Sequence, residues 1–186
     1  MAYLKSLLQN VKPLDVYKNF PDTALPLIEY QDRLLRSPSP FTMGERELMM
    51  AFVSALNTSH FCQGLHGAIA AQFGLADDLL LALVNDIDTA PVAAEIKPIM
   101  KYIRKLTLSP AAITFEDAEA IYAAGWDEKA LYDAASVCAL SNFMNRLVAG
   151  LGLTADTDYF HAAAEGLAAH GYAPLAELVT ADKEPC

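Results

Sequence analysis

The sequence has few cysteines and few positive charges, and both shortages exclude classes of protein. The three cysteines, Cys62, Cys138 and Cys186, are an odd number at wide spacing, which argues against a disulfide framework and fits a reducing compartment. There are 13 basic residues against 23 acidic ones, for a formal net charge of −10. Because nucleic-acid backbones and anionic membranes are bound by clustered lysine and arginine, we expect neither as a partner.

Long apolar runs are also lacking. A transmembrane helix needs about 18 or more apolar residues in a row, whereas the longest candidate, Leu48 to Leu56, is shorter and contains Ser54. The N-terminus reaches Gln9 and Lys12 without an apolar stretch or a small-residue cleavage site, so it does not resemble a signal peptide. We therefore expect a cytoplasmic protein.

Strand-type alternation of apolar and polar residues is nearly absent, whereas alanine, leucine, methionine and glutamate recur at helical spacing. The sequence therefore predicts an all-α protein. The segment 37–40 (Ser-Pro-Ser-Pro) cannot continue a helix, and Gly74, Gly125 and Gly150 stand where helices should end. The predicted helices cover residues 23–36, 43–57, 60–73, 76–84, 93–107, 115–124, 128–149, 156–170 and 173–181.

The length of the chain fits one domain, which we assign to residues 1–186 with its core motif at 43–73. Hydrophobic residues make up 54% of the sequence, and the mean hydropathy is +0.22. Both values are high for a soluble monomer of this size, so one subunit has more apolar surface than it can bury. We therefore expect a homo-oligomer.

Cys62 and His66 are the residues best placed to carry chemistry. The stretch from Glu47 to His66 is interpreted as helix, tight break, helix, with Cys62 in the first turn of the second helix and Ser59 as its N-cap. Unpaired N–H groups and the helix dipole at such a position lower a thiol pKa. His66 lies one turn further on the same face. Its imidazole can accept the thiol proton, stabilise the thiolate or protonate a leaving oxygen.

Two glutamates precede this pair, and helix capping separates their roles. Thr42 and Glu45 have the spacing of a capping box, which accounts for Glu45. Glu47 has no such role. If the two helices pack antiparallel across a break at Asn57, its carboxylate approaches the second helix. Burial among apolar side chains would raise its pKa, which suits a proton relay.

Each of these residues also has an ordinary structural interpretation. A free cysteine is usually a small buried hydrophobe, and a single histidine on a helix is more often a packed or surface residue. We expect His60 to face solvent. On the predicted helix 128–149, the polar row that contains Cys138, Asn142 and Asn145 is interpreted as close helix packing in preference to a pocket wall.

The spacing of these residues resembles that of a known family. From Glu47 it is twelve residues to Ser59, fifteen to Cys62 and nineteen to His66. This is similar to the signature of alkylhydroperoxidase D-like proteins of the carboxymuconolactone decarboxylase superfamily, a glutamate followed by Cys-x-x-Cys-x-x-x-His. Further along, the stretches 102–110, 125–126 and 142–152 resemble the subgroup of uncharacterised peroxidase-related proteins. The resemblance covers most of residues 20–175.

The resemblance implies an all-helical fold, an apolar pocket near a subunit interface, and symmetric oligomers, with dimer, trimer and hexamer all open. It also implies that Cys62 attacks a hydroperoxide, that His66 and Glu47 relay protons, and that Ser59 stands where the resolving cysteine belongs. Serine cannot form the disulfide of a two-cysteine cycle. Three interpretations remain: a one-cysteine peroxidase reduced by an external thiol, a descendant with different small-molecule chemistry, or an inactive protein.

The second interpretation includes a lyase similar to carboxymuconolactone decarboxylases. Their substrate is a compact dicarboxylate lactone, so such a site needs basic side chains facing the pocket, and Arg46, Arg104 and Arg146 are the candidates. The third is a binding or structural oligomer in which Cys62 is inert.

The other two cysteines are poor resolving thiols. Cys138 lies within a predicted helix, and Cys186 lies on a C-terminal tail that we expect to be mobile. We expect no cofactor. A metal ion is also not expected, because Cys62, His66 and Glu47 lack a clear fourth ligand.

Overall fold

The computed structural model describes residues 2–7, 11–76 and 78–181, and within them the protein is all-α with no strand, as predicted. None of the described helices is long and apolar enough to cross a membrane. The elements are α1 (Pro13–Asn19), α2 (Pro21–Arg36), α3 (Met43–Leu56), α4 (His60–Gln72), α5 (Leu79–Asn85), α6 (Ile96–Leu108), the 3-10 turn η1 (Pro110–Ala112), α7 (Phe115–Ala123), α8 (Glu128–Gly150), α9 (Thr157–His170) and α10 (Pro174–Thr180).

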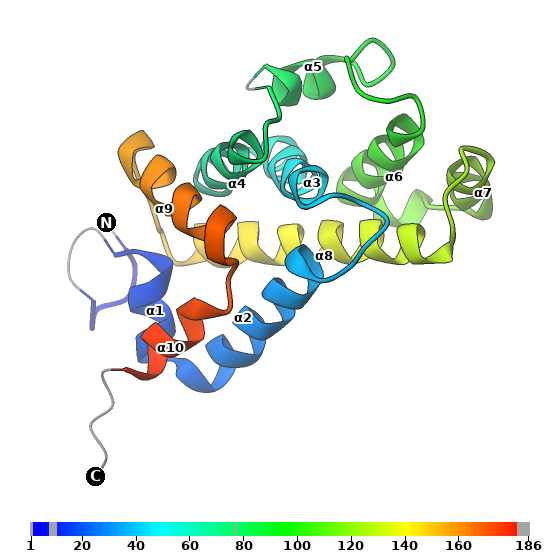
Figure 1. Ribbon diagram of the computed structural model, residues 1–186. Coiled ribbons are helices and arrows are strands. Elements are labelled where there is room, and N and C mark those ends of the chain that lie inside the picture. The colour runs from blue at the N-terminus through cyan, green and yellow to red at the C-terminus, as the bar shows by residue number, and fades with distance from the viewer. Residues whose placement is uncertain (1, 8–10, 77, 182–186) are drawn as a thin grey trace.

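Helix α3 forms the centre of the molecule. It contacts α2, α4, α5, α6 and α8, and every residue from Arg46 to Ser54 is buried. Figure 1 shows the long helix α8 crossing beneath α3, α4 and α6, with α1, α2 and α10 gathered at one end. A polar side chain in the middle of α3 is thus enclosed from several directions and needs partners from other elements.

The hairpin of α3 and α4 reverses within three residues. Thr58 adopts a positive φ of 54°, a left-handed conformation that reverses the chain direction. Thr42 and Asp127 form the predicted caps at the starts of α3 and α8, where their side chains accept hydrogen bonds from the backbone N–H groups of Glu45 and Ala130. Gly64 allows α9 to approach α4, since a Cβ there would lie 2.5 Å from the ring of Phe160.

The predicted helices are all present, with end points shifted by a few residues. Helix α1 and the start of α2 at Pro21 were not predicted from the sequence. Helix α1 has only seven residues, and so short a helix is marginal in isolation. It packs against α2 and α10, contacts between distant parts of the chain that local periodicity does not report.

Candidate active site

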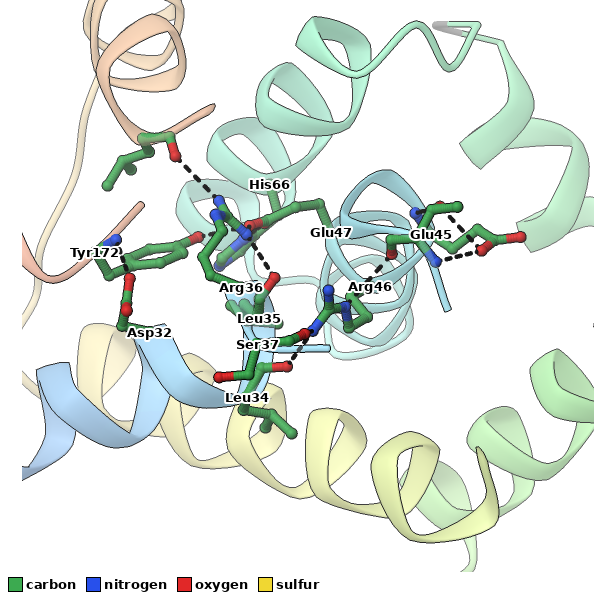
Figure 2. Close-up of polar contacts among 12 residues, drawn as sticks. Asp32, Leu34, Leu35, Arg36, Ser37, Glu45, Arg46, Glu47, His66 and Tyr172 are labelled. Carbon is green, nitrogen blue, oxygen red and sulfur yellow. Dashed lines mark hydrogen bonds and ion pairs between the residues drawn. The ribbon is translucent and has the colours of Figure 1, made fainter. Parts of the chain in front are cut away.

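The side chain of Glu47 is fully buried and joined to three residues from other elements. Its Oε2 lies 2.6 Å from Nδ1 of His66 on α4, and its Oε1 lies 2.7 Å from Nη1 of Arg36 at the end of α2. The hydroxyl of Tyr172, between α9 and α10, donates to Oε1 at 2.9 Å. Figure 2 shows these groups converging on the carboxylate from three sides.

The predicted increase in the pKa of Glu47 is wrong. Burial is the largest single influence and raises the pKa, but the hydrogen bond and charge of His66, together with the charge of Arg36, outweigh it and hold the pKa below its ordinary value. Paired carboxylates remain ionised in this way. Glu47 is therefore a buried anion that fixes the orientation of the His66 ring, and its bond to Nδ1 leaves Nε2 as the uncommitted ring nitrogen.

The groups that surround Glu47 are themselves held in place. Arg36 donates to the carbonyl oxygens of Leu35 and Leu167, and its guanidinium lies 4.8 Å from the centroid of the Tyr172 ring. The carboxylate of Asp32 accepts hydrogen bonds from the backbone N–H groups of Tyr172 and the residue after it. These contacts connect α2 with the segment that carries Tyr172.

A cavity of about 300 Å³ lies beside this network, and both Cys62 and His66 line it. Most of its wall is apolar and comes from α1, α4, α8, α9 and α10. The exposed residues Ala162, Gly166 and Leu178 belong to the wall, so the cavity reaches the surface between α9 and α10. None of the described residues that line it is a lysine or an arginine.

Cys62 lies in the first turn of α4 as predicted, but the expected lowering of its pKa is wrong. Its side chain is enclosed, and burial raises the thiol pKa more than hydrogen bonds from Ser59 and Asn145 lower it. Ser59 is at the N-cap position, yet its side chain makes no capping bond. Since desolvation disfavours an anion, Cys62 is a thiol at neutral pH when the cavity is unfilled.

Alkylation should report this pKa directly. With Cys138 and Cys186 replaced by alanine, we expect the rate of Cys62 alkylation by iodoacetamide to be half-maximal at a pH above 9.0, the ordinary value for a thiol. Mass spectrometry across a pH series measures the rate. A midpoint below 9.0 would show that the helix terminus dominates over burial.

The polar row on α8 packs against α3, which confirms the structural interpretation. Asn57 Nδ2 donates to Oδ1 of Asn142 at 3.0 Å and of Asn145 at 2.9 Å. Asn145 Nδ2 donates to the hydroxyl of Ser54 at 2.9 Å. Asn145 also lies close enough to the thiol of Cys62 to lower its pKa, so the row that joins the two helices extends to Cys62.

Several sequence candidates lie elsewhere. Glu45 completes the capping box with Thr42, and His60 is exposed as expected. Cys138 is fully buried beside Thr107 and does not line the cavity with Cys62. Cys186 lies outside the described residues.

The three arginines proposed for a lactone site bind other groups. Arg46 donates to the carbonyl oxygens of Leu34 and Ser37. Arg104 donates to carbonyl oxygens of the α5 segment, and Arg146 to Asn142 on its own helix. Within the part of the chain that the structure describes, no group of three His, Cys, Asp or Glu side chains could hold a metal ion.

Sequence reasoning missed Arg36, Tyr172 and the contact of Asn145 with Cys62. Arg36 is the last residue of α2, where a basic residue is commonly explained by the helix dipole. Tyr172 follows Gly171, whose φ of 73° ends α9. The polar row that contains Asn145 was the one sequence feature that pointed to these residues, and it favoured helix packing over a functional site.

No protein-family model and no curated protein matches the chain. Two solved structures share its architecture. The "alkylhydroperoxidase AhpD core", an uncharacterized peroxidase-related protein from Ralstonia eutropha JMP134, is 21% identical, with a TM-score of 0.72 over 80% of this chain and 78% of that one. An uncharacterized peroxidase-related protein from Silicibacter sp. TM1040 is 20% identical, with a TM-score of 0.72 over 86% and 94% of the two chains. This chain therefore has the all-helical fold of the alkylhydroperoxidase AhpD core.

Proposed function

We propose that the protein reduces an organic hydroperoxide with the thiol of Cys62, and that His66 and Glu47 handle the proton. The observation that carries the proposal is that Cys62 and His66 line one apolar cavity while Glu47 holds the opposite nitrogen of the imidazole at 2.6 Å. A nucleophile, a base and a group that orients the base are the components of an activated thiol. The names of the two structural neighbours agree with peroxidase-related chemistry.

In the first step, Nε2 of His66 takes the thiol proton as the sulfur attacks the terminal peroxide oxygen. A sulfur–oxygen bond forms and the oxygen–oxygen bond breaks. The sulfur is oxidised by two electrons to a sulfenic acid, and the peroxide is reduced to an alcohol after His66 returns the proton to the leaving oxygen. Because burial raises the thiol pKa, the proton leaves during the attack and not before it.

The cycle is closed by an external low-molecular-weight thiol. It condenses with the sulfenic acid to a mixed disulfide and water, and a second thiol molecule releases Cys62 as the external disulfide forms. Ser59 cannot resolve the sulfenic acid internally, although its side chain lies close enough to Cys62 to lower the thiol pKa. Cys138 is sealed in the core.

The lining of the cavity favours this function over the lyase. A dicarboxylate lactone is bound best by lysine or arginine side chains, and the described residues around the cavity include neither. The guanidinium of Arg36, which contacts the carboxylate behind His66, is already paired with Glu47. An uncharged organic substrate loses no ionic solvation on entering such a cavity.

Cumene hydroperoxide provides the test. We expect stoichiometric hydroperoxide to convert Cys62 to a sulfenic acid that a dimedone probe traps and peptide mass spectrometry locates. Glutathione added before the probe should remove the adduct. Cys138 in the same sample serves as the internal control and should carry no label, because it is fully buried. Absence of label at Cys62 would refute the proposal.

A further inference from the structure

Tyr17 on α1 is a mostly buried tyrosine at the wall of the cavity. Its exposed fraction is 7%, and its side chain lines the same cavity as Cys62 and His66. Among the residues that the structure describes, none hydrogen-bonds to its hydroxyl. The hydroxyl oxygen is not one of the fully enclosed atoms that lack a partner, so it remains accessible and is a donor available to whatever enters the cavity.

Two other tyrosines line the cavity, and neither is in the same environment as Tyr17. The hydroxyl of Tyr172 is committed to Glu47. Tyr159 is only partly buried, and its pKa is raised by burial and by Asp15. The pKa of Tyr17 is raised by burial first and then by the neighbouring Cys62 and Tyr159. Tyr17 is therefore close enough to interact with the thiol, and its hydroxyl keeps its proton at neutral pH.

We propose that Tyr17 is a further catalytic residue, whose hydroxyl donates a hydrogen bond to the leaving oxygen of the hydroperoxide during attack by Cys62. This inference rests on the proposed function and adds a residue to it. As the oxygen–oxygen bond breaks, negative charge develops on the alkoxide oxygen. A positioned donor stabilises that charge more than it stabilises the neutral peroxide. Tyr17 keeps its proton, and His66 supplies the one that completes the alcohol.

The Cys62–His66 pair and Tyr17 reach the cavity from different helices. Cys62 and His66 project from α4, whereas Tyr17 comes from α1, which packs on α2 and α10. The substrate oxygens are thus met by groups from separate elements lining one cavity. Helix α1 then contributes to the reaction as well as to the enclosure of the cavity.

The test compares two reactions of the same sulfur in wild type and Tyr17→Phe. We expect the second-order rate constant for oxidation of Cys62 by cumene hydroperoxide to fall about 10- to 100-fold, somewhat less than the loss of a full oxyanion donor. Alkylation by iodoacetamide creates no alkoxide, so its rate should change by less than about 2-fold. Tyr132→Phe, an exposed position on α8, is the matched control and should change neither rate.

Each other outcome has a distinct meaning. Equal oxidation rates in wild type and Tyr17→Phe overturn the role of Tyr17 and leave the proposed function standing. A parallel loss in both reactions also overturns it, because the substitution would then have disturbed the thiol itself. A wild-type Cys62 that hydroperoxide does not oxidise overturns the proposed function, and the role of Tyr17 with it. Thermal unfolding gives a separate check, since removal of a hydroxyl that bonds to none of the described residues should not lower the melting temperature.

Discussion

Replacement of Cys62 by serine should abolish hydroperoxide turnover, with a loss of at least about 10³-fold in the rate constant, as expected when the nucleophile of a catalytic unit is removed. A serine hydroxyl is far harder to ionise than a thiol, and it cannot be oxidised to a sulfenic acid. The measurement is consumption of cumene hydroperoxide with glutathione as reductant. The fold should survive, because the substitution is nearly isosteric.

Cys138→Ala is the matched control for this prediction. Cys138 is fully buried and packs beside Thr107, away from the cavity. Its replacement should leave turnover within about 2-fold of wild type, because Cys138 does not line the cavity that contains Cys62. Turnover that survives in Cys62→Ser but is lost in Cys138→Ala would show that the reaction uses Cys138 and not Cys62, contrary to our proposal.

Replacement of Glu47 by glutamine should reduce the free energy of unfolding by about 3–5 kcal/mol, the usual effect of removing one partner of a buried ion pair. The amide keeps the shape of the side chain but removes the charge that compensates Arg36, with which Oε1 is paired at 2.7 Å. Urea denaturation monitored by circular dichroism measures the loss. Glu29→Gln is the control: its pair with Arg33 is largely exposed, so that change should stay within about 1 kcal/mol.

The effect of Glu47 should also depend on pH in a defined direction. Its pKa in the folded protein lies below the ordinary value of 4.5, so the folded state binds its proton less readily than the unfolded state. The stabilisation is fully present above about pH 4.5 and is lost as the pH falls through the folded-state pKa. The difference in stability between wild type and Glu47→Gln should therefore shrink in acid. A difference that stays constant from pH 7 to pH 3 would contradict this assignment.

Much of the site could be predicted from local spacing. The spacing of four positions from Cys62 to His66 places both side chains on one face of α4, as it does in any α-helix. The capping box at Thr42 gave Glu45 a structural role, and Glu47 then remained as the glutamate available for a functional role. Its contact with His66 across the hairpin follows from the antiparallel packing expected around Asn57.

The directions of the pKa shifts of Glu47 and Cys62 could not be predicted, because they depend on which groups from distant parts of the sequence pack beside them. The sequence indicated one influence on each pKa, burial for Glu47 and the helix terminus for Cys62. In the structure, Arg36 and His66 reverse the effect of burial on the carboxylate. For the thiol, enclosure exceeds the effect of its hydrogen bonds. A pKa is the sum of opposing contributions, and each needs a position in space.

The sequence by itself determined most of the helices, the caps at Thr42 and Asp127, and the placement of Cys62 and His66 on one face of α4, because those features depend on neighbours within about one helical turn. Only the tertiary structure decided which residues complete the site. Arg36, Tyr172, Asn145 and Tyr17 come from four separate parts of the chain. Burial requires the polar groups of Arg36, Tyr172 and Asn145 to find partners wherever the packing places them, and the same packing brings Tyr17 to the cavity wall. Local periodicity contains no information about that placement.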